Sequence, residues 1–196
     1  ISLSKNQIEY CKRKAKELNL DNQVKFELID YREAQGKYDR IFSVGMFEHV
    51  GKKFYNVFFK SINRLLKNDG LFLLHTIGVV DKPSPPNKFI NKYIFPGGVC
   101  PSLSQIIKPI EKTGLIVADT ETLIRHYDKT LLSWLSRFMA KKHLVKDMFD
   151  EKFVKMWSFY LASCAAAFRY RDLAVFQLQI VKNFDAARPT RDYIYS

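Results

Sequence analysis

Cysteine is scarce in this sequence, with Cys11, Cys100 and Cys164 as its three examples among 196 residues. They are too few and too scattered for a disulfide framework or a zinc site. We therefore expect no metal and a reduced, cytosolic compartment. Long apolar runs are lacking as well. No stretch approaches the roughly 20 residues that a membrane helix needs, and no charged leader precedes an apolar stretch. The sequence thus predicts neither a membrane span nor a signal peptide.

The sequence also lacks a glycine-rich turn, although it contains eight glycines. A nucleotide-type site normally presents such a turn directly after its first strand. Residues Ile1–Leu3 look like the last residues of a strand that leads straight into a helix. We therefore expect that a first strand and its glycine-rich loop belong upstream and are missing from this chain.

Acidic residues are fewer than basic ones: 20 Asp and Glu against 32 Lys and Arg give a net charge of +12. Such an excess suggests an anionic partner, either a nucleic acid or an acidic membrane surface; the alternative is a merely soluble basic protein. Base-reading motifs are absent and most aromatic residues fall on apolar stripes, which argues against nucleic acid. The basic cluster of Lys141, Lys142, His143 and Lys146 is either a solvated face or a membrane-docking segment.

Hydrophobic periodicity predicts strands that alternate with helices in a single domain. The predicted strands are 24–29, 41–44, 71–77, 115–118 and 174–181. The predicted helices begin at Ser4 and Ser102, each with a capping box, or carry apolar faces over 55–66, 131–138 and 153–168. Asn68–Gly70 should end the helix before the strand at 71, with Gly70 at its C-cap. This order predicts a mostly parallel α/β sheet flanked by helices.

Two polar blocks follow two of these strands directly. They are Gly45–Gly51 (GMFEHVG) and the end of Leu74–Gly78 (LHTIG). Glu48 and His75 would then project from the carboxyl ends of two parallel strands, the edge where open α/β sheets bind ligands. A carboxylate and an imidazole that meet there indicate acid/base or charge-stabilising chemistry. The alternative is that Glu48 and the adjacent His49 only cap the helix that follows.

Six short blocks spread over nearly the whole chain form a specific combination. They are Ser2–Gln7 (SLSKNQ), Tyr38–Gly51 (YDRIFSVGMFEHVG), Leu71–Gly78 (LFLLHTIG), Ile90–Gly98 (INKYIFPGG), His126–Leu131 (HYDKTL) and Cys164–Arg169 (CAAAFR). In this order they resemble the cyclopropane-fatty-acyl-phospholipid synthases and the mycolic acid cyclopropane synthases, which depend on S-adenosylmethionine. The resemblance implies a Rossmann-like class I methyltransferase fold. It makes residues 1–196 a single, partial catalytic domain, with a mostly helical insertion at 126–170 that covers the acyl site.

The resemblance also implies a reaction. The methyl carbon of S-adenosylmethionine passes to the double bond of an unsaturated acyl chain in membrane phospholipid, a proton leaves, and a cyclopropane ring closes. In this family a bound bicarbonate ion accepts that proton, and the matching residues here are Glu48, His75, the carbonyl of Ile77 and Tyr127, with a backbone group upstream. Negative charge and aromatic faces suit a transient carbocation, and His75 and Tyr127 offer hydrogen-bond donors to bicarbonate.

Cys164 is a further candidate for the catalytic set, because its block has invited a nucleophile label in the family. It falls on the apolar stripe that also carries Leu161 and Phe168, a position that predicts a buried, inert thiol. Methyl transfer to an alkene needs no thiolate. The alternative is therefore that Cys164 only packs.

Cofactor contacts follow from the same resemblance. Ser2, Leu3, Ser4, Lys5, Asn6 and Gln7 match the segment that wraps the ribose of S-adenosylmethionine. Asp30 and Tyr31 match the turn beside the adenine. Ser4 and Gln7 also form a capping box without any cofactor, so both roles stay open for them.

The implied partners are unsaturated phospholipid acyl chains at an anionic membrane surface, reached by peripheral association with the inner face of the membrane. A homodimer is possible, and no nucleic acid is expected. Two alternatives remain: a related S-adenosylmethionine-dependent acyl-chain methyltransferase with another product, or, for this fragment, a non-catalytic basic lipid-binding module. The sequence does not specify the preferred acyl chain or the oligomeric state.

Overall fold

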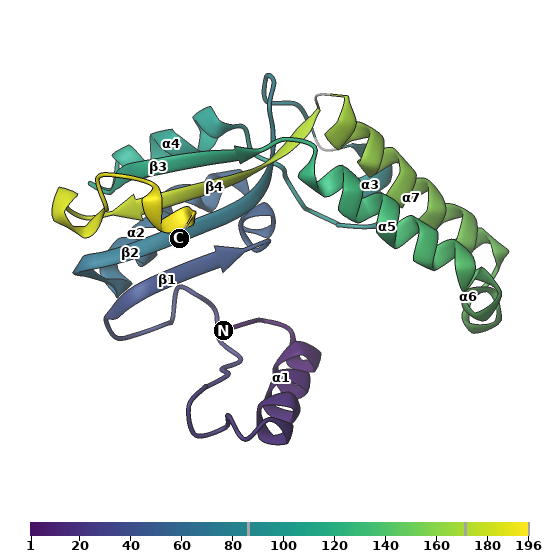
Figure 1. Ribbon diagram of the computed structural model, residues 1–196, viewed down its shortest axis with the longest axis horizontal. Helices are drawn as coiled ribbons and strands as arrows, with labels where there is room; N and C mark the ends of the chain where they lie inside the picture. The colour runs from purple at the N-terminus through teal and green to yellow at the C-terminus, as the bar shows by residue number, and fades with distance from the viewer. Residues whose placement is uncertain (86, 171, 196) are drawn as a thin grey trace.

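The computed structural model describes residues 1–85, 87–170 and 172–195, and a four-stranded sheet forms its centre (Figure 1). In spatial order the strands are β1 (Tyr38–Val44), β2 (Leu66–Val79), β4 (Leu173–Val181) and β3 (Ile116–Leu123). β1 and β2 are parallel, whereas β4 runs antiparallel to both β2 and β3. The sheet is therefore mixed: β1, β2 and β3 point the same way, as the alternating pattern predicts, and β4 is reversed between two of them.

Two amphipathic helices, α2 (Tyr55–Leu65) and α4 (Leu103–Glu111), pack with the sheet into the main core. Alternate residues of β2 and β4 point to this core because side chains alternate along a strand. There they join aromatic residues such as Phe58 and Phe59, which are fully buried. Each buried side chain of this size contributes roughly 1.5–3 kcal/mol by leaving water. This cluster therefore fixes the position of β2, from which the candidate site is built.

A helical arm extends away from one end of the sheet (Figure 1). The helices of this region are α3 (Lys88–Tyr93), α5 (His126–Ala140), α6 (Lys142–Met148) and α7 (Glu151–Arg169). α5 and α7 lie side by side around a second core that includes Leu131, Leu161 and Phe168, and α6 lies at the far end of the arm. Residues 126–170 are thus mostly helical, whereas their role as a cover of the acyl site stays a prediction.

The amino-terminal segment contacts the sheet only sparsely. Helix α1 (Lys5–Glu17) lies beside the edge formed by β1 (Figure 1). The predicted strand at 24–29 is wrong: among the described residues, a single parallel bridge from Ser2 to Leu28 is all that forms there. The reason is the lack of a neighbour, because the described partner of β1 is β2 alone. Two apolar residues of β1, Phe42 and Val44, are accordingly 76% and 61% exposed.

Two local predictions about helix ends need correction. α2 ends at Leu65 and β2 begins at Leu66, so Gly70 lies inside the strand and not at a C-cap. The helix stops early because Leu66 adopts an extended conformation and is completely buried opposite Tyr38 of β1. Tertiary burial thus overrides the local turn signal.

The capping box at the start of α1 is only half formed. The Ser4 hydroxyl accepts a hydrogen bond from the Gln7 amide at 3.3 Å, but the Gln7 side chain accepts one from Ser2 Oγ at 2.8 Å. The second box, between Ser102 and Gln105 at the start of α4, is complete. Pro109 lies within α4, as the sequence predicts.

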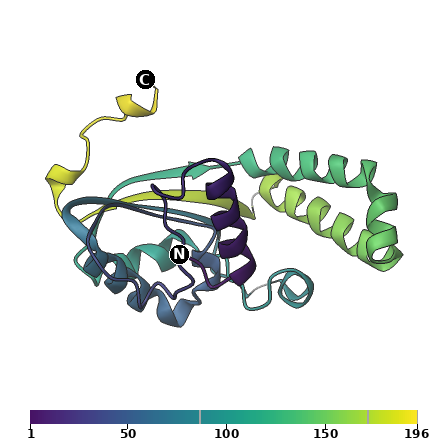
Figure 2. The ribbon, with the colours of Figure 1, turned by 90° about the horizontal axis from the view of Figure 1, so that it is seen from below.

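The chain continues past β4 as a tail that turns away from the sheet (Figure 2). The tail holds two short 3-10 helices, η3 (Phe184–Ala186) and η4 (Asp192–Ile194). It is tied back to the sheet by Arg191, which binds Asp119 of β3, and by Tyr193, which binds Gln179 of β4. Within the described residues, no helix has the length and apolar character to cross a membrane.

Gly78 provides a test of how β2 packs at its carboxyl end. A Cβ atom at this position would lie 2.3 Å from the Phe176 ring and 2.4 Å from the Pro101 carbonyl oxygen. We expect Gly78→Ala to lower the free energy of unfolding by about 2–3 kcal/mol, because neither neighbour can move freely. Urea denaturation measures this change. Gly97→Ala is the control, since its Cβ meets nothing within 4 Å and only the positive φ of 75° should cost roughly 1 kcal/mol. Equal losses for the two variants would contradict the close approach of Pro101.

Candidate active site

The candidate site begins where β1 leaves the edge of β2. Gly45 has a φ of 66°, a value that favours glycine, and its amide still donates to the His75 carbonyl at 3.1 Å. The chain then turns into a short 3-10 helix, η1 (Phe47–His49), and a second, η2 (Lys52–Phe54), leads into α2. Phe47 is fully buried and stacks on Tyr55 with 4.3 Å between ring centroids. This anchor fixes the position of the next residue, Glu48.

β1 ends at Val44, and the Glu48 carboxylate then accepts the backbone hydrogen bond from β2 that a longer β1 would accept. Its Oε1 accepts a hydrogen bond from the Ile77 amide at 2.8 Å, and two residues further along β2 the Val79 amide donates to the Pro101 carbonyl at 3.0 Å. The backbone oxygen of Glu48 accepts from the Val99 amide at 2.8 Å. The alternative, that Glu48 and His49 only cap the helix that follows, is wrong for α2, because its N-cap residue is Phe54 and no side chain caps it.

The second carboxylate oxygen of Glu48 is the unusual atom of the site. Oε2 is buried, and no described residue donates a hydrogen bond to it. Leaving a buried polar group without a partner costs roughly 1–3 kcal/mol, and more for a charged one. The Ile77 carbonyl lies between the amides that bind Glu48 and Pro101, and it accepts a hydrogen bond from the Thr76 hydroxyl at 3.2 Å. The site thus combines the Glu48 Oε2 acceptor, which has no described donor, with the backbone carbonyl of Ile77.

Tyr127, in the first turn of α5, carries a hydroxyl that is influenced by the charge of Glu48 but makes no described hydrogen bond to it. Its ring packs against Phe168 at 5.1 Å and against Trp134 at 5.9 Å. Burial raises the pKa of Tyr127, and the charge of Glu48 raises it further. The hydroxyl is therefore neutral at physiological pH and lies within the electrostatic influence of Glu48. The next residue, Asp128, is buried and accepts two hydrogen bonds from Arg169, which fixes this turn against the end of α7.

His75 lies two residues before Ile77 on β2 and shares its face of the sheet. The described side-chain contact of its ring is with Gln177 on β4, with Nδ1 3.0 Å from Oε1. The structure thus links Glu48 directly to Ile77 and electrostatically to Tyr127, and it places His75 at the neighbouring register position. The roles of these four residues stay predictions.

Sequence reasoning missed three groups beside this set. Burial is the main cause that raises the pKa of Cys100 to about 12, and the charge of Glu48 adds to it. Tyr55 and Tyr160 have their pKa values raised to about 12, also chiefly by burial. Cys100 lies two residues after the glycine pair that ends the INKYIFPGG block, a signal that could have identified it. Cys164 has its pKa raised to about 11 by burial, so its thiol is protonated at neutral pH.

The cofactor-binding candidates form a second group at the amino-terminal edge. The bridge from Ser2 to Leu28 brings the Ser2–Gln7 segment beside the turn that holds Asp30. The Asp30 carboxylate is already bound by the Arg32 side chain at 2.7 and 2.8 Å, and this contact lowers the pKa of Asp30. Tyr31 packs edge-on against Phe58 at 5.3 Å. The two segments are therefore neighbours, and Asp30 would have to share its carboxylate with a ligand.

The other members of the Ser2–Gln7 segment are open to solvent. Leu3 is 73% exposed, Asn6 is exposed, and the Lys5 ammonium lies 3.8 Å from the Glu9 carboxylate. The described side-chain hydrogen bonds of this segment stay within it and do not reach Glu48. Its role in holding S-adenosylmethionine therefore stays a prediction.

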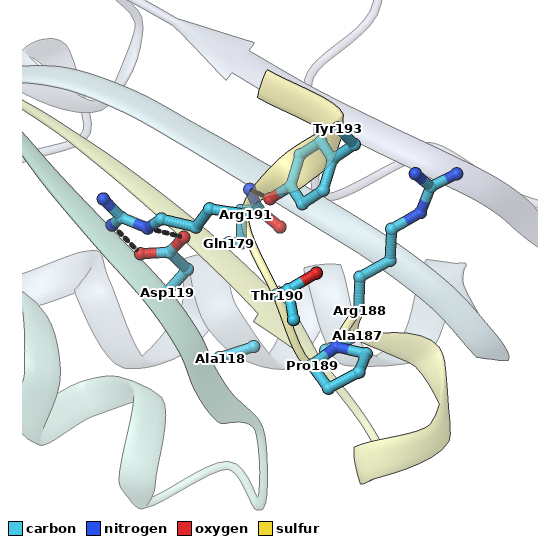
Figure 3. A pocket seen from close by; sticks show the side chains of 9 residues that line it. All are labelled: Ala118, Asp119, Gln179, Ala187, Arg188, Pro189, Thr190, Arg191 and Tyr193. Atoms are coloured by element: carbon cyan, nitrogen blue, oxygen red, sulfur yellow. Dashed lines mark hydrogen bonds and ion pairs between the residues drawn. The ribbon is translucent and has the colours of Figure 1, made fainter. Parts of the chain in front are cut away.

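Two cavities have linings that do not include Glu48. One, of about 200 Å³, is formed by the tail against β3 and β4 (Figure 3). Its lining residues are Ala118, Asp119, Gln179, Ala187, Arg188, Pro189, Thr190, Arg191 and Tyr193, none of them a predicted site residue. A second, of about 660 Å³, adjoins the Asp30 turn and is lined by Leu28, Ile29 and Glu33 among others. Within the described part of the chain, no cluster of three His, Cys, Asp or Glu side chains could hold a metal ion.

Comparison with known proteins places these residues in a family. A family model described as mycolic acid cyclopropane synthetase matches residues 1–178. A cyclopropane-fatty-acyl-phospholipid synthase of Escherichia coli (strain K12) is 44% identical over 151 residues, 77% of this chain and 39% of that protein. A probable fatty acid methyltransferase of Pseudomonas putida is 34% identical over 191 residues, 94% of this chain and 48% of that protein. The chain thus spans less than half the length of these two curated relatives.

Solved structures give the same result. The mycolic acid cyclopropane synthase CmaA1, complexed with SAH and CTAB, matches with a TM-score of 0.79 at 30% identity, over 91% of this chain and 67% of that one. The predicted class I methyltransferase fold and the resemblance to cyclopropane synthases are both confirmed.

The raised pKa values of two thiols predict their chemical reactivity. At a pH well below the pKa of a thiol, each unit by which that pKa rises lowers the thiolate fraction about tenfold. The pKa rises from an ordinary value near 9 to about 12 in Cys100 and to about 11 in Cys164, so most of the reactive thiolate is lost in both. At pH 8 we expect iodoacetamide to modify Cys164 roughly 100-fold and Cys100 roughly 1,000-fold more slowly in the native chain than in urea, as measured by mass spectrometry of peptides. Rapid native modification of Cys164 would contradict its assignment as an inert thiol.

Proposed function

Because the chain belongs to the mycolic acid cyclopropane synthetase family, we propose that it carries the reacting centre of an S-adenosylmethionine-dependent enzyme that converts a double bond of a phospholipid acyl chain into a cyclopropane ring. The observation that carries this proposal is the buried Oε2 of Glu48, to which no described residue donates, on a carboxylate that binds the Ile77 amide and influences Tyr127 electrostatically. The family and the structural likeness support acyl-chain methylation. The phospholipid and the ring product are the parts that we add.

The reaction balances without a metal or an oxidant. The alkene attacks the methyl group of S-adenosylmethionine and S-adenosylhomocysteine leaves; the resulting cation loses one proton and closes the ring. A fixed negative charge in a site that excludes water stabilises such a cation far more than it would in water. Glu48 provides that charge, and its hydrogen bond to the Ile77 amide prevents it from turning away.

A bicarbonate ion fits the groups that remain. Its O–H can satisfy Oε2 of Glu48 or the Ile77 carbonyl, while the Tyr127 hydroxyl can donate to its charged oxygens. When bound, such an ion would supply a base for the departing proton. The neutral phenol of Tyr127 favours this arrangement, because a phenolate would repel the ion.

S-adenosylmethionine would be held by the Ser2–Gln7 segment and by the turn at Asp30 and Tyr31. The bridge between Ser2 and Leu28 supports this, since it brings both segments together. The related CmaA1 structure is a complex with SAH, which agrees with a cofactor of this class. The alternative of a non-catalytic basic module has no support from the comparisons.

Contact with an anionic membrane would involve the far end of the helical arm. Met148 and Phe149 are 73% and 59% exposed there, at the end of α6, and Lys141 and Lys142 lie at the start of the same short helix. Asp147 and Asp150 flank the apolar pair directly, and Lys146 and Lys152 lie further out. Exposed apolar side chains with lysines nearby suit insertion between anionic headgroups. We propose this arm tip as the site of peripheral association.

The function is tested with the protein in its natural full length. It is incubated with S-adenosylmethionine and vesicles of phosphatidylglycerol that carries a cis-monounsaturated acyl chain. We expect acyl chains that gain one CH₂ group and lose their double bond, measured by mass spectrometry before and after hydrogenation. A product that gains CH₂ but keeps a double bond would establish the related methyltransferase instead. No transfer to any unsaturated lipid would contradict the proposal.

Two substitutions separate electrostatic from nucleophilic catalysis. Glu48→Gln keeps an acceptor for the Ile77 amide but removes the charge, so turnover should fall roughly 100-fold or more while cofactor affinity changes little. Cys164→Ser should keep most turnover and lower the free energy of unfolding by about 1–3 kcal/mol, because it buries a hydroxyl among apolar groups. Steady-state rates and urea denaturation measure both. A folded but inactive Ser variant together with a nearly normal Gln variant would reverse these roles.

The arm tip has its own test. Replacing Met148 and Phe149 together with serine should weaken binding to phosphatidylglycerol vesicles at least tenfold, because burying either side chain in lipid contributes more than about 1 kcal/mol. Vesicle sedimentation measures this affinity. Phe184→Ser is the control, since Phe184 is 81% exposed but lies in the tail beyond β4. Unchanged binding of the double variant would exclude the tip as the contact.

A further inference from the structure

A row of side chains crosses the sheet next to the candidate site. In the register of the strands, His75 of β2 lies opposite Gln177 of β4, and Gln177 lies opposite Glu121 of β3. Cross-strand neighbours of this kind have their Cβ atoms close enough for direct contact. His75 Nδ1 is 3.0 Å from Gln177 Oε1, and Gln177 Nε2 donates to Glu121 Oε2 at 2.8 Å. The three side chains thus form one continuous hydrogen-bonded chain.

The donor and acceptor directions of these two hydrogen bonds follow from the chemistry of the Glu121 carboxylate at one end of the row. A carboxylate only accepts hydrogen bonds, so Glu121 must face the NH₂ group of the Gln177 amide. The amide oxygen then necessarily faces His75, and an amide oxygen also only accepts. Nδ1 of His75 must therefore carry a hydrogen in the neutral ring as well as in the charged ring. The Glu121 carboxylate selects the tautomer of a histidine two strands away.

The next row of the sheet, formed by Asp119 and Gln179, has different partners from the row of Glu121. Asp119, two residues earlier on β3, binds the Arg191 guanidinium of the tail, and Gln179 beside it donates to Tyr193 (Figure 3). Among the described residues, Glu121 takes part in no ion pair. Its described side-chain hydrogen bond is the one from Gln177. Its acceptor capacity is therefore directed along the row to His75.

We infer that Glu121 and Gln177 are positioning residues that hold the His75 ring with a hydrogen on Nδ1 and leave Nε2 as its free nitrogen. The inference rests on the proposed function for its meaning: neutral His75 would offer bicarbonate an acceptor at Nε2, as a third candidate beside Glu48 Oε2 and the Ile77 carbonyl for the single O–H of the ion, and it would not donate a hydrogen bond. This reverses the donor role that the sequence suggests for His75. Tyr127 remains the donor of the site.

Nitrogen NMR of the histidine rings tests the inference without any activity measurement. The protein in its natural full length is labelled with ¹⁵N-histidine and studied at about pH 9, where histidine rings are neutral. The His75 signals are assigned by their loss in His75→Gln. We expect long-range ¹H–¹⁵N correlations that show a protonated Nδ1 and an unprotonated Nε2. A ring with its hydrogen on Nε2 in the unsubstituted protein would overturn the inference.

Substitutions then test the origin of the selection. Glu121→Gln keeps the size of the side chain but can both donate and accept, so the Gln177 amide can reverse and both tautomers of His75 should appear. Gln177→Leu should have the same effect, because leucine makes no hydrogen bond to either Glu121 or His75. Asp119→Asn and Gln179→Leu are the matched controls in the adjacent row and should leave His75 unchanged.

The outcome is independent of methyl transfer. An Nδ1-protonated His75 that loses this preference in Glu121→Gln supports the positioning role, even in a protein that transfers no methyl group. A preference that persists in both Glu121→Gln and Gln177→Leu overturns that role, even in an active enzyme.

Discussion

The hydrogen bond from the Ile77 amide to the Glu48 carboxylate is the interaction on which the candidate site depends. β1 ends at Val44, whereas β2 continues to Val79, so the edge of β2 would otherwise present unpaired backbone groups. Buried amides almost always find partners. Here the ladder is completed first by the Gly45 amide, then by a side chain, and finally by the Pro101 carbonyl. One of the three partners of the β2 edge is therefore a charged side chain, the Glu48 carboxylate.

This edge also organises the rest of the molecule around it. Gly78 has no Cβ, which lets Pro101 approach β2 and brings Cys100 within the electrostatic influence of Glu48. The helical arm adds Tyr127, held by the ion pair of the buried Asp128 with Arg169. Because β4 is inserted between β2 and β3, a carboxylate on β3 can act on His75 through a single glutamine. Sheet register, not local sequence, creates that connection.

The sequence predicted the parts of the fold that depend on local burial. The apolar runs at 71–77 and 174–181 mark two strands because such runs need burial. The run at 41–44 also forms a strand, β1, although Phe42 and Val44 are exposed there. The strand at 24–29 was wrong because its pairing depends on a neighbour, and Gly70 was misassigned because burial of Leu66 outweighs a turn signal. Glu48 and Tyr127 could be identified by family motifs. Glu121 could not, since its contact with Gln177 spans 56 residues and carries no motif.

The buried, unpartnered oxygen of Glu48 is better explained by function than by stability. A glutamine at this position would satisfy the Ile77 amide equally well without burying a charge, and a helix cap needs no carboxylate at this point, because the N-cap of α2 is Phe54. A carboxylate here therefore lowers stability relative to simpler solutions, by the roughly 1–3 kcal/mol or more of an unsatisfied buried group. Proteins retain such a destabilising group at functional sites, where it interacts with a bound ligand or a reacting molecule. A cation that forms only during turnover, and an ion whose O–H completes the carboxylate, both meet that description.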